Sequence, residues 1–524
     1  MSFAVLIPTA GTGSRLGALT RYINKSLVSI DNRPAICHII ERFPDEAEFV
    51  VALGYRGDLV EDFLRMAYPG KAFRFVRVSP YEGEGSGLGL SVLCCEAYLH
   101  RPFVFVSCDT LVKEAIPAPD RNWMGYAFRE DNTPYRTLEM SRGAVSEICE
   151  KGAGGANARP YIGLAGIYDH EAFWDAMRRG GRDAVATGES YGLRNLLSRG
   201  VSAIEFTWYD TGNLEELATT REAYKRKDAP NILEKANEAI WFVGDRVVKF
   251  SDDEKFIKGR IKRAGLLEGY VPAVTDSASK LYSYRKVPGR VLSEAVNIPV
   301  FESLLDVCRS FWARRDPSGV DFRAVCRRFY RDKTLERVAL FYRNFERKDT
   351  PTVINGVEAP PLAELFDRLD WGWLSDGLPG RCHGDFHFEN IIYTAGSGTF
   401  TFIDWRQDFG GLLEVGDIYY DLAKLLHGLI VCHELIAFDR YRVEWREDGV
   451  IDFDLDRKHI LVECERHYLG WLAREGYDVG KVRVLTALVY LNIAALHHHP
   501  YGLMLYALGK EMLWNELEGI GTND

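Results

Sequence analysis

The segment 383–390, with the sequence HGDFHFEN, constrains this chain more than any other feature. A short apolar run follows it and ends in Asp404, so that Asp385, Asn390 and Asp404 offer three oxygen-bearing groups. An aspartate in the position of Asp385 can accept or orient the proton of a substrate hydroxyl. Asn390 and Asp404 can hold the Mg²⁺ that bridges the phosphates of ATP. Each residue alone could be a turn cap or a strand-end carboxylate, but the set predicts phosphoryl transfer.

This pattern resembles the aminoglycoside phosphotransferase and choline kinase group, which are distant relatives of protein kinases. The resemblance extends over about residues 232–425 and includes the segment GDIYYDLA at 416–423. It implies that Lys249, in a predicted strand, binds ATP phosphate, and that the segment 283–289 borders adenine. The chain departs from the kinase pattern in having no G-x-G-x-x-G loop before Lys249. Glu254 and Glu268 are both imperfect candidates for the usual glutamate partner of this lysine.

The first part of the chain alternates short apolar runs with helical patterns. The predicted strands are 3–7, 49–53, 73–78 and 103–107. This alternation predicts an α/β fold of Rossmann type with a mixed, mostly parallel sheet. The first strand runs into the loop PTAGTGSRL at 8–16, where Gly11 and Gly13 allow backbone N–H groups to approach a phosphate. Arg15 can bind phosphate oxygens in a bidentate manner, with two of its guanidinium nitrogens.

Three further residues give this glycine loop a chemical context. Lys25 follows the loop, and Asp109 ends an apolar strand, where α/β sheets place ligand-binding residues. Asp210 lies much later, before a glycine turn. Two carboxylates brought together would hold Mg²⁺ with a nucleoside triphosphate, because Mg²⁺ binds few protein oxygens besides phosphate and water.

In this order the motifs resemble the sugar-phosphate and choline-phosphate nucleotidylyltransferases. The matching positions within about residues 1–225 are Gly11, Gly13, Arg15, Leu16, Lys25, Asp109, Glu150, Lys151 and Asp210. The usual opening Leu-Ala-Ala-Gly is replaced by PTAG, and Asn24 stands where proline is customary. These departures affect the expected base selectivity more than the expected chemistry.

The two resemblances also imply individual roles. Arg15 would hold the leaving pyrophosphate and Lys25 the region of the α-phosphate, while Lys151, beside Glu150, would bind the incoming phosphate. The implied nucleotide-binding residues are Ala10, Gly11, Gly13, Arg15, Lys25, Gly87 and Lys249. The segment 83–87 (GEGSG) that contains Gly87 could equally be a flexible loop.

These motifs divide the chain into two predicted domains. A nucleotidylyltransferase domain over 1–228 precedes a bilobal protein-kinase-like α+β domain over 229–524. Within the second domain we expect a small lobe at about 229–290, with a hairpin around Gly244-Asp245, and a helical lobe at about 291–524. Leu335, Val338, Ala339 and Tyr342 predict one face of an amphipathic helix.

Composition excludes several other functions. Lys and Arg total 65 against 75 Asp and Glu, a net charge of −10, so we expect no nucleic-acid partner. The longest apolar stretch, 484–496, falls short of the ~20 residues of a membrane span and predicts a buried helix. The ten cysteines form no CxxC pattern, which favours reduced thiols and a cytoplasmic location. Nothing in the sequence indicates the oligomeric state.

Some conspicuous residues have simpler interpretations. The histidines at 497–499 follow an apolar helix and face different directions, which favours a helix-end cluster over a metal site. Trp371, Trp373 and Trp405 could line a pocket for a cationic amino alcohol, but for at least two of them we expect core packing. We expect His383 to support the backbone of the catalytic loop.

Together the two domains predict a bifunctional enzyme whose steps follow one another. A small amino alcohol, polyol or sugar would be phosphorylated by ATP, and a second nucleotide, with CTP favoured by the resemblance, would donate NMP to the product. The resulting NDP-activated donor would serve the biosynthesis of a capsule or related surface glycan. One alternative is a sugar kinase joined to a sugar-1-phosphate nucleotidylyltransferase that uses UTP or GTP. Another is a nucleotide-sensing regulatory protein with one inactive half.

Overall fold

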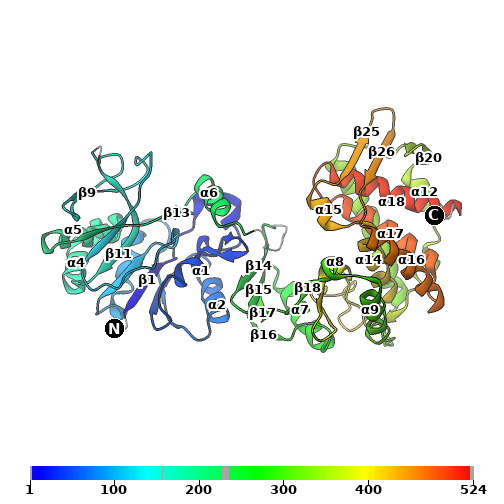
Figure 1. Ribbon diagram of the computed structural model, residues 1–524, viewed down its shortest axis with the longest axis horizontal. Helices are drawn as coiled ribbons and strands as arrows, with labels where there is room; N and C mark the ends of the chain where they lie inside the picture. The colour runs from blue at the N-terminus through cyan, green and yellow to red at the C-terminus, as the bar shows by residue number, and fades with distance from the viewer. Residues whose placement is uncertain (1–2, 156, 227–234, 520–524) are drawn as a thin grey trace. The chain divides into compact units, whose positions relative to one another are not determined.

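The structure is a computed structural model that describes residues 3–155, 157–226 and 235–519. The chain divides into two compact units (Figure 1). The first unit comprises Met1–Glu254 and Thr275–Lys286, and the second comprises Lys255–Val274 and Val287–Asp524. The predicted domain boundary between residues 228 and 229 lies outside the described residues.

A mixed sheet of nine strands forms the centre of the described part of the first unit. Four neighbouring strands pair in parallel: β5 (Ala72–Arg77), β4 (Glu48–Leu53), β1 (Ala4–Pro8) and β6 (Phe103–Val106). The predicted strands 3–7, 49–53, 73–78 and 103–107 are therefore confirmed, with small shifts at their ends. The sheet continues with β11 (Arg159–Ile167), β8 (Trp123–Tyr126), β12 (Ser202–Glu205), β10 (Ala144–Cys149) and β9 (Thr137–Ser141). Parallel pairing beyond the first four strands occurs between β8 and β12, and the other neighbours are antiparallel.

Both faces of this sheet are buried because successive residues of its central strands enter different hydrophobic clusters. Val5 and Ile7 of β1 belong to one cluster, whereas Ala4 and Leu6 belong to the other. A strand that is apolar at every position requires this double cover, since its side chains alternate between the two faces. The larger helices of this unit are α1 (Ala35–Ile40), α2 (Gly57–Ala67), α3 (Leu88–Leu93), α4 (His170–Thr187), α5 (Glu189–Leu196) and α6 (Leu214–Tyr224).

A second, four-stranded sheet packs into the same core. It contains β14 (Glu238–Val243), β15 (Arg246–Ser251), β17 (Leu281–Arg285) and β16 (Val274–Ser277), in this order, and confirms the predicted hairpin around Gly244-Asp245. The Trp241 ring of β14 lies edge-on to Phe63 of α2, with 5.1 Å between ring centroids. Its indole nitrogen donates a hydrogen bond of 2.9 Å to the Ser29 hydroxyl. These contacts place the small sheet with the N-terminal unit, which no motif indicated.

The second unit is largely helical. Its main helices are α7 (Glu254–Leu266), α9 (Ile298–Phe311), α10 (Phe322–Arg327), α11 (Lys333–Asn344), α12 (Leu362–Arg368), α13 (Trp371–Ser375), α14 (Ile418–Ile430), α16 (His459–Arg474), α17 (Val479–Ala494) and α18 (Tyr501–Glu518). Helix α14 is buried along nearly its whole length. Helix α17 confirms most of the predicted buried helix at 484–496, although it ends at Ala494 and Leu496 is exposed. A three-stranded sheet of β18 (Arg290–Val291), β22 (Ile391–Thr394) and β23 (Thr399–Phe402) precedes Asp404. Among the described residues, no helix combines the length and apolar character needed to cross a bilayer.

Candidate active sites

In the N-terminal unit, the glycine loop joins β1 to a short 3-10 helix, η1 (Ser14–Thr20). Gly13 has a φ of +69°, and a Cβ atom there would lie 2.8 Å from the Lys25 Cβ, so only glycine fits. The buried Asn24 donates hydrogen bonds to the carbonyls of Thr9 (2.8 Å) and Tyr55 (2.7 Å). A proline could not make these bonds, so the departure at Asn24 anchors the loop.

The loop brings Lys25 against Asp109, which are 84 positions apart in the sequence. The Lys25 ammonium lies 3.0 Å from Asp109 Oδ2, and the Ser107 hydroxyl donates a 2.5 Å hydrogen bond to Oδ1. Burial alone would raise the pKa of Asp109, but the charge of Lys25 and these hydrogen bonds lower it to about 2. Asp109 is therefore a carboxylate at neutral pH.

Asp210 lies beside Asp109 because β13 (Trp208–Asp210) pairs with β7 (Thr110–Val112). The Gly212 amide donates a 2.7 Å hydrogen bond to Asp210 Oδ1. A Cβ atom on Gly212 would lie 3.0 Å from Asp210 Oδ1, 3.3 Å from Asp109 Oδ2 and 3.4 Å from Arg15 Nη2. The two predicted metal ligands and the predicted phosphate-binding arginine therefore converge on one point.

The electrostatics of this point fit a bound cation. Burial and the neighbouring charge of Asp109 raise the pKa of Asp210. Like charges in a partly buried site destabilise one another, and a divalent cation between them removes this cost. Carboxylate oxygens are the ligands that Mg²⁺ prefers, so the donor set matches the predicted metal.

The structure separates other predicted residues from this point. The Glu150 carboxylate forms ion pairs with Arg136, at 3.2 Å, and with Arg194. Lys151 follows in an exposed turn, and within the described part of the chain neither residue bonds to Asp109 or Asp210.

The glycines and the alanine predicted to bind nucleotide occupy different surroundings. Ala10 is buried, and its carbonyl accepts a hydrogen bond of 2.9 Å from the Tyr55 amide. Gly11 is exposed, with no atom within 4 Å of the position that a Cβ would take. Gly87 precedes α3, and a Cβ there would lie 2.4 Å from the Val185 carbonyl oxygen, so this glycine allows close packing of α3 on α4. Lys249, in β15 of the small sheet, is 7% exposed, and its ammonium lies 5.9 Å from the centre of the Tyr284 ring.

In the C-terminal unit, Asp385 lies in the loop between β21 (Pro379–Gly380) and β22. The Lys424 ammonium lies 2.8 Å from Asp385 Oδ1. The Asn390 amide nitrogen donates to the Asp385 carbonyl (2.9 Å) and to Oδ2 (3.2 Å), which leaves the Asn390 side-chain oxygen for a cation. Burial would raise the pKa of Asp385, but Lys424 and His387 hold it well below its usual value. No sequence pattern indicated Lys424, which directly follows the motif-like segment 416–423.

Asp404 follows β23 in a left-handed conformation, with a φ of +62°. The amide of Ile403 donates a 2.8 Å hydrogen bond to the Asn390 carbonyl, which ties the two predicted metal ligands together through the backbone. The Arg260 guanidinium of α7 lies 3.9 Å from Asp404 Oδ1. The structure thus gathers Asp385, Asn390 and Asp404 on the loop and hairpin that the sequence predicted.

The histidines of the catalytic loop have opposite electrostatic surroundings. His383 is fully buried and accepts a 3.3 Å hydrogen bond from the Asp385 amide, in agreement with its predicted support of the loop. Burial lowers the pKa of His383 to about 3. The His387 ring donates from Nδ1 to Glu389, at 2.9 Å. Burial would lower the pKa of His387, but Asp385 and Glu389 raise it to about 9.

Asp421 of α14 supports the catalytic loop through hydrogen bonds. The sequence motifs did not assign a role to this residue. Its carboxylate accepts the backbone N–H groups of His383 (2.6 Å) and Gly384 (2.7 Å). It also accepts the indole N–H of Trp312, at 3.1 Å. The resemblance at 416–423 was the sequence signal, although it did not indicate which groups the aspartate would bind.

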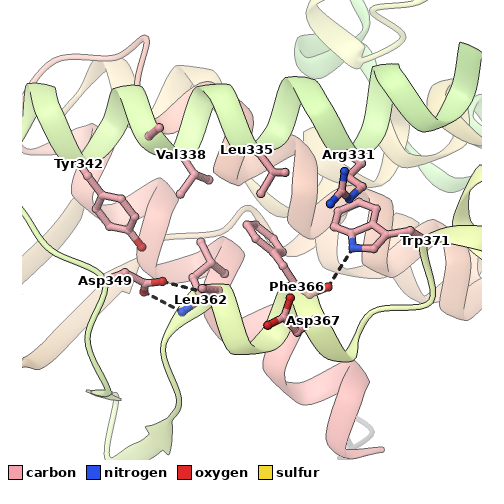
Figure 2. Close-up of a pocket in the computed structure, with 11 residues that line it drawn as sticks. Arg331, Leu335, Val338, Tyr342, Asp349, Leu362, Phe366, Asp367 and Trp371 are labelled. Carbon is pink, nitrogen blue, oxygen red and sulfur yellow. Dashed lines mark hydrogen bonds between the residues drawn. The ribbon is translucent and has the colours of Figure 1, made fainter.

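The indole nitrogens of the three predicted pocket tryptophans donate hydrogen bonds to groups other than Asp385. Trp405 is fully buried and donates to the Arg260 carbonyl at 2.9 Å, and Trp373 donates to Asp478 at 3.0 Å. Trp371 does line a cavity of about 280 Å³ between α11 and α12, shown in Figure 2. The predicted apolar face of α11 lines the same cavity, where Leu335 is 38% exposed.

Comparison with known proteins supports the assignment of the C-terminal unit. The model of the phosphotransferase enzyme family, APH, matches residues 319–447. This range contains Asp385, Asn390 and Asp404, together with the supporting Asp421. The match confirms the predicted phosphotransferase domain and, with it, the prediction that the chain is an enzyme.

Several solved structures resemble less than half of this chain. UDP-glucose pyrophosphorylase complexed with UDP-glucose is 19% identical, with 43% of this chain and 98% of that chain covered and a TM-score of 0.36. CTP:phosphocholine cytidylyltransferase from Streptococcus pneumoniae is 17% identical, with coverage of 43% and 100% and a TM-score of 0.37. A putative glucose-1-phosphate thymidylyltransferase from Bacillus anthracis is 15% identical, with coverage of 45% and 98% and a TM-score of 0.37. No curated protein sequence matches this chain.

Proposed function

We propose that this chain is a bifunctional enzyme that phosphorylates a small hydroxyl compound with ATP and then transfers NMP from a second nucleotide to the product. One observation carries the proposal: each unit contains a carboxylate that is paired with a lysine and lies close to another residue that could bind a metal. These pairs are Lys25–Asp109 in the first unit and Lys424–Asp385 in the second. A regulatory protein with one inactive half would have no need to keep both pairs.

In the kinase step, the acceptor hydroxyl oxygen attacks the γ-phosphorus of ATP, the bond from that phosphorus to the β-phosphate oxygen breaks, and ADP leaves. Asp385 accepts and orients the hydroxyl proton. Its low pKa makes it a positioning acceptor more than a strong base. Asn390 and Asp404 are the residues that would hold Mg²⁺, and Lys249 would bind ATP phosphate.

In the nucleotidyl step, a phosphate oxygen of the new product attacks the α-phosphorus of the second nucleotide. The bond between the α-phosphorus and the β-phosphate oxygen breaks, and pyrophosphate leaves. Such a transfer depends on positioning and charge neutralisation, because the attacking phosphate is already ionised. Arg15 would hold the pyrophosphate and Lys25 the α-phosphate region, while Lys151, beside Glu150, would bind the incoming phosphate.

The remaining assignments concern the nucleotide and the metal. Backbone N–H groups of Ala10, Gly11 and Gly13, with Gly87, would border the nucleotide. Asp109 and Asp210 are the residues that would hold Mg²⁺, which when bound neutralises charge on the reacting phosphates. We propose CTP as the second nucleotide and an NDP-activated donor for a surface glycan as the product.

The decisive experiment follows both steps in one reaction. The full chain is incubated with Mg²⁺, ATP and CTP, UTP or GTP over a panel of alcohols, polyols and sugars, and both phospho- and nucleotidyl-products are detected by mass. We expect Asp385→Asn to abolish phosphorylation but to leave nucleotidyl transfer to an added phosphorylated acceptor. Asp210→Asn should do the reverse. If either variant leaves both steps intact, the proposed division of labour is wrong, and a preference for UTP or GTP would refute the choice of CTP.

A further inference from the structure

Lys333, Arg406 and Lys424 lie near Asp385, Arg337 lies near Lys333, and the reaction described above does not use all four. We call Lys333, Arg337, Arg406 and Lys424 the basic cluster. Lys333 and Arg337 lie one turn apart on α11, Arg406 follows Asp404 by two residues, and Lys424 belongs to α14. The cluster therefore draws on three segments that are distant in sequence.

Ring contacts position two of these side chains, Lys333 and Arg406. The Lys333 ammonium lies 4.3 Å from the centre of the Phe329 ring, and the Arg406 guanidinium carbon lies 5.6 Å from the same centre. Arg406 also donates a 3.1 Å hydrogen bond to the Tyr420 hydroxyl. The Tyr420 ring lies 4.9 Å from the Phe329 ring between centroids, and Tyr420 precedes Lys424 by one helical turn. The two rings therefore link Lys333, Arg406 and Lys424.

The cluster adjoins the reacting carboxylate directly. The Lys424 ammonium contacts Asp385 Oδ1 at 2.8 Å. The aliphatic part of Arg406 packs over Gly384, where a Cβ atom would lie within 2.9 Å of three Arg406 carbons. Gly384 has a φ of +88°, so a larger residue is excluded there and the arginine lies across the loop next to Asp385.

Positive charge is in excess at this place. Asp385 and Asp408 are carboxylates whose charges act on Arg406, whereas Lys333 forms no ion pair in the described part of the chain. Burial and repulsion from Arg406, Arg337 and Lys424 lower the pKa of Lys333 to about 7. Partly buried cations that repel one another are stabilised when an anion binds between them.

We propose that the basic cluster binds an anionic group, a carboxylate or a phosphate, on the acceptor whose hydroxyl is phosphorylated. The inference rests on the proposed kinase function and narrows its substrate class to hydroxy acids and phosphorylated alcohols. It replaces the expectation of a cationic amino alcohol, because the positive charges of the basic cluster would repel such a substrate. The phosphates of ATP offer the same chemistry, so a test must separate the two sources.

The two sources of the anion can be separated by measuring phosphate binding to protein that already holds a nucleotide. The full chain is saturated with Mg²⁺ and the non-hydrolysable ATP analogue AMP-PNP, and inorganic phosphate is titrated in a calorimeter. We expect Lys333→Met to weaken a phosphate-binding event about tenfold or more, because a charge-assisted contact is lost. Lys333→Arg should retain the event. Arg343→Met, a charge removal at an exposed position of the same helix, should not change it. Phosphate bound in the N-terminal unit contributes equally in all variants.

The outcomes are distinct. Equal phosphate binding in wild type and Lys333→Met, or binding only when AMP-PNP is absent, overturns the inference and, in the second case, assigns the cluster to ATP. If AMP-PNP itself does not bind, the proposed kinase function fails and the inference falls with it. A second arm compares ATP consumption with glycerate and glycerol 3-phosphate against glycerol and ethanolamine. We expect the anionic acceptors to be favoured, and faster turnover of glycerol or ethanolamine overturns the inference.

Discussion

Asp421 offers the sharpest test of how the kinase site is held together. Its Oδ2 accepts the backbone N–H of His383 (2.6 Å) and the indole N–H of Trp312 (3.1 Å). Its Oδ1 accepts the backbone N–H of Gly384 (2.7 Å) and the thiol of Cys382 (3.3 Å). The Asp421 side chain is fully buried, so water could not replace it as the acceptor for these four donors. We consider the replacement Asp421→Asn, which keeps the shape and removes one acceptor oxygen.

The expected loss of stability in Asp421→Asn follows from the hydrogen bonds that an asparagine cannot accept. One of the two backbone donors then faces an amide NH₂ group, and a hydrogen bond to a charged acceptor contributes about 1.5–3 kcal/mol. Burial raises the pKa of Asp421, so removal of its charge returns part of this loss. We therefore expect a net destabilisation of about 2 kcal/mol in the C-terminal unit. For a unit of this size, that lowers its unfolding midpoint by roughly 4–8 °C.

Two measurements on one sample check this reasoning. Calorimetry of the full chain records the unfolding of the C-terminal unit, and activity assays follow each half-reaction. We expect phosphorylation to fall about 100-fold, since the loop that carries Asp385 loses its support, while nucleotidyl transfer stays unchanged. Asp332→Asn, which removes a surface partner 3.5 Å from Arg331, serves as the control and should shift neither quantity. An unchanged midpoint together with full kinase activity in Asp421→Asn would refute the argument.

Two further predictions concern the N-terminal unit. Gly212→Ala places a methyl group 3.0 Å from Asp210 Oδ1 and 3.3 Å from Asp109 Oδ2, so nucleotidyl transfer should fall about 100-fold, with circular dichroism unchanged. Gly70→Ala, where no atom lies within 4 Å, is its control, and wild-type activity in Gly212→Ala would contradict the proposed metal position. The second prediction uses the pKa of Asp109, which is lowered to about 2 from an unperturbed 3.8. A lowered carboxyl pKa stabilises the fold above the unfolded value and loses this effect as the pH falls towards about 2. Lys25→Met should therefore be less stable than wild type at pH 6 in urea unfolding, by a difference that shrinks between pH 4 and pH 2, whereas a constant difference would exclude the ion pair as its cause.

Some of the fold could be predicted from local patterns. The strand at 49–53 is apolar at every position, and β4 is indeed buried on both faces of the sheet. The hairpin at Gly244-Asp245 follows from turn chemistry between two apolar runs. Asp385 and Asn390 are five positions apart, so a single loop suffices to bring them together. These features depend on residues close in sequence, and their physical causes act over the same short range.

The partners of buried charges could not be predicted in this way. Asp421 is separated from Gly384 by 37 positions, and no period or spacing connects them. A buried carboxylate must find hydrogen-bond donors, but the sequence does not say which backbone groups will be free to donate. The packing of the small sheet on the N-terminal core could not be predicted either. Trp241 is recognisable in the sequence as a core residue, but the sequence does not indicate which domain's core it joins.

The sequence by itself determined the two catalytic motifs, their order and the chemistry of their donor groups, since side-chain type and short spacing are local properties. Only the tertiary structure decided which distant groups complete each site. Pairing of β13 with β7 brings Asp210 to Asp109. Contacts of the Phe329 ring with Lys333, Arg406 and Tyr420 of α14 assemble the basic cluster. The physical reason is that electrostatic excess is a property of charges in space. Lys333 and Arg406 are ordinary surface-like cations in the sequence, and their charges become concentrated once folding places both against the Phe329 ring.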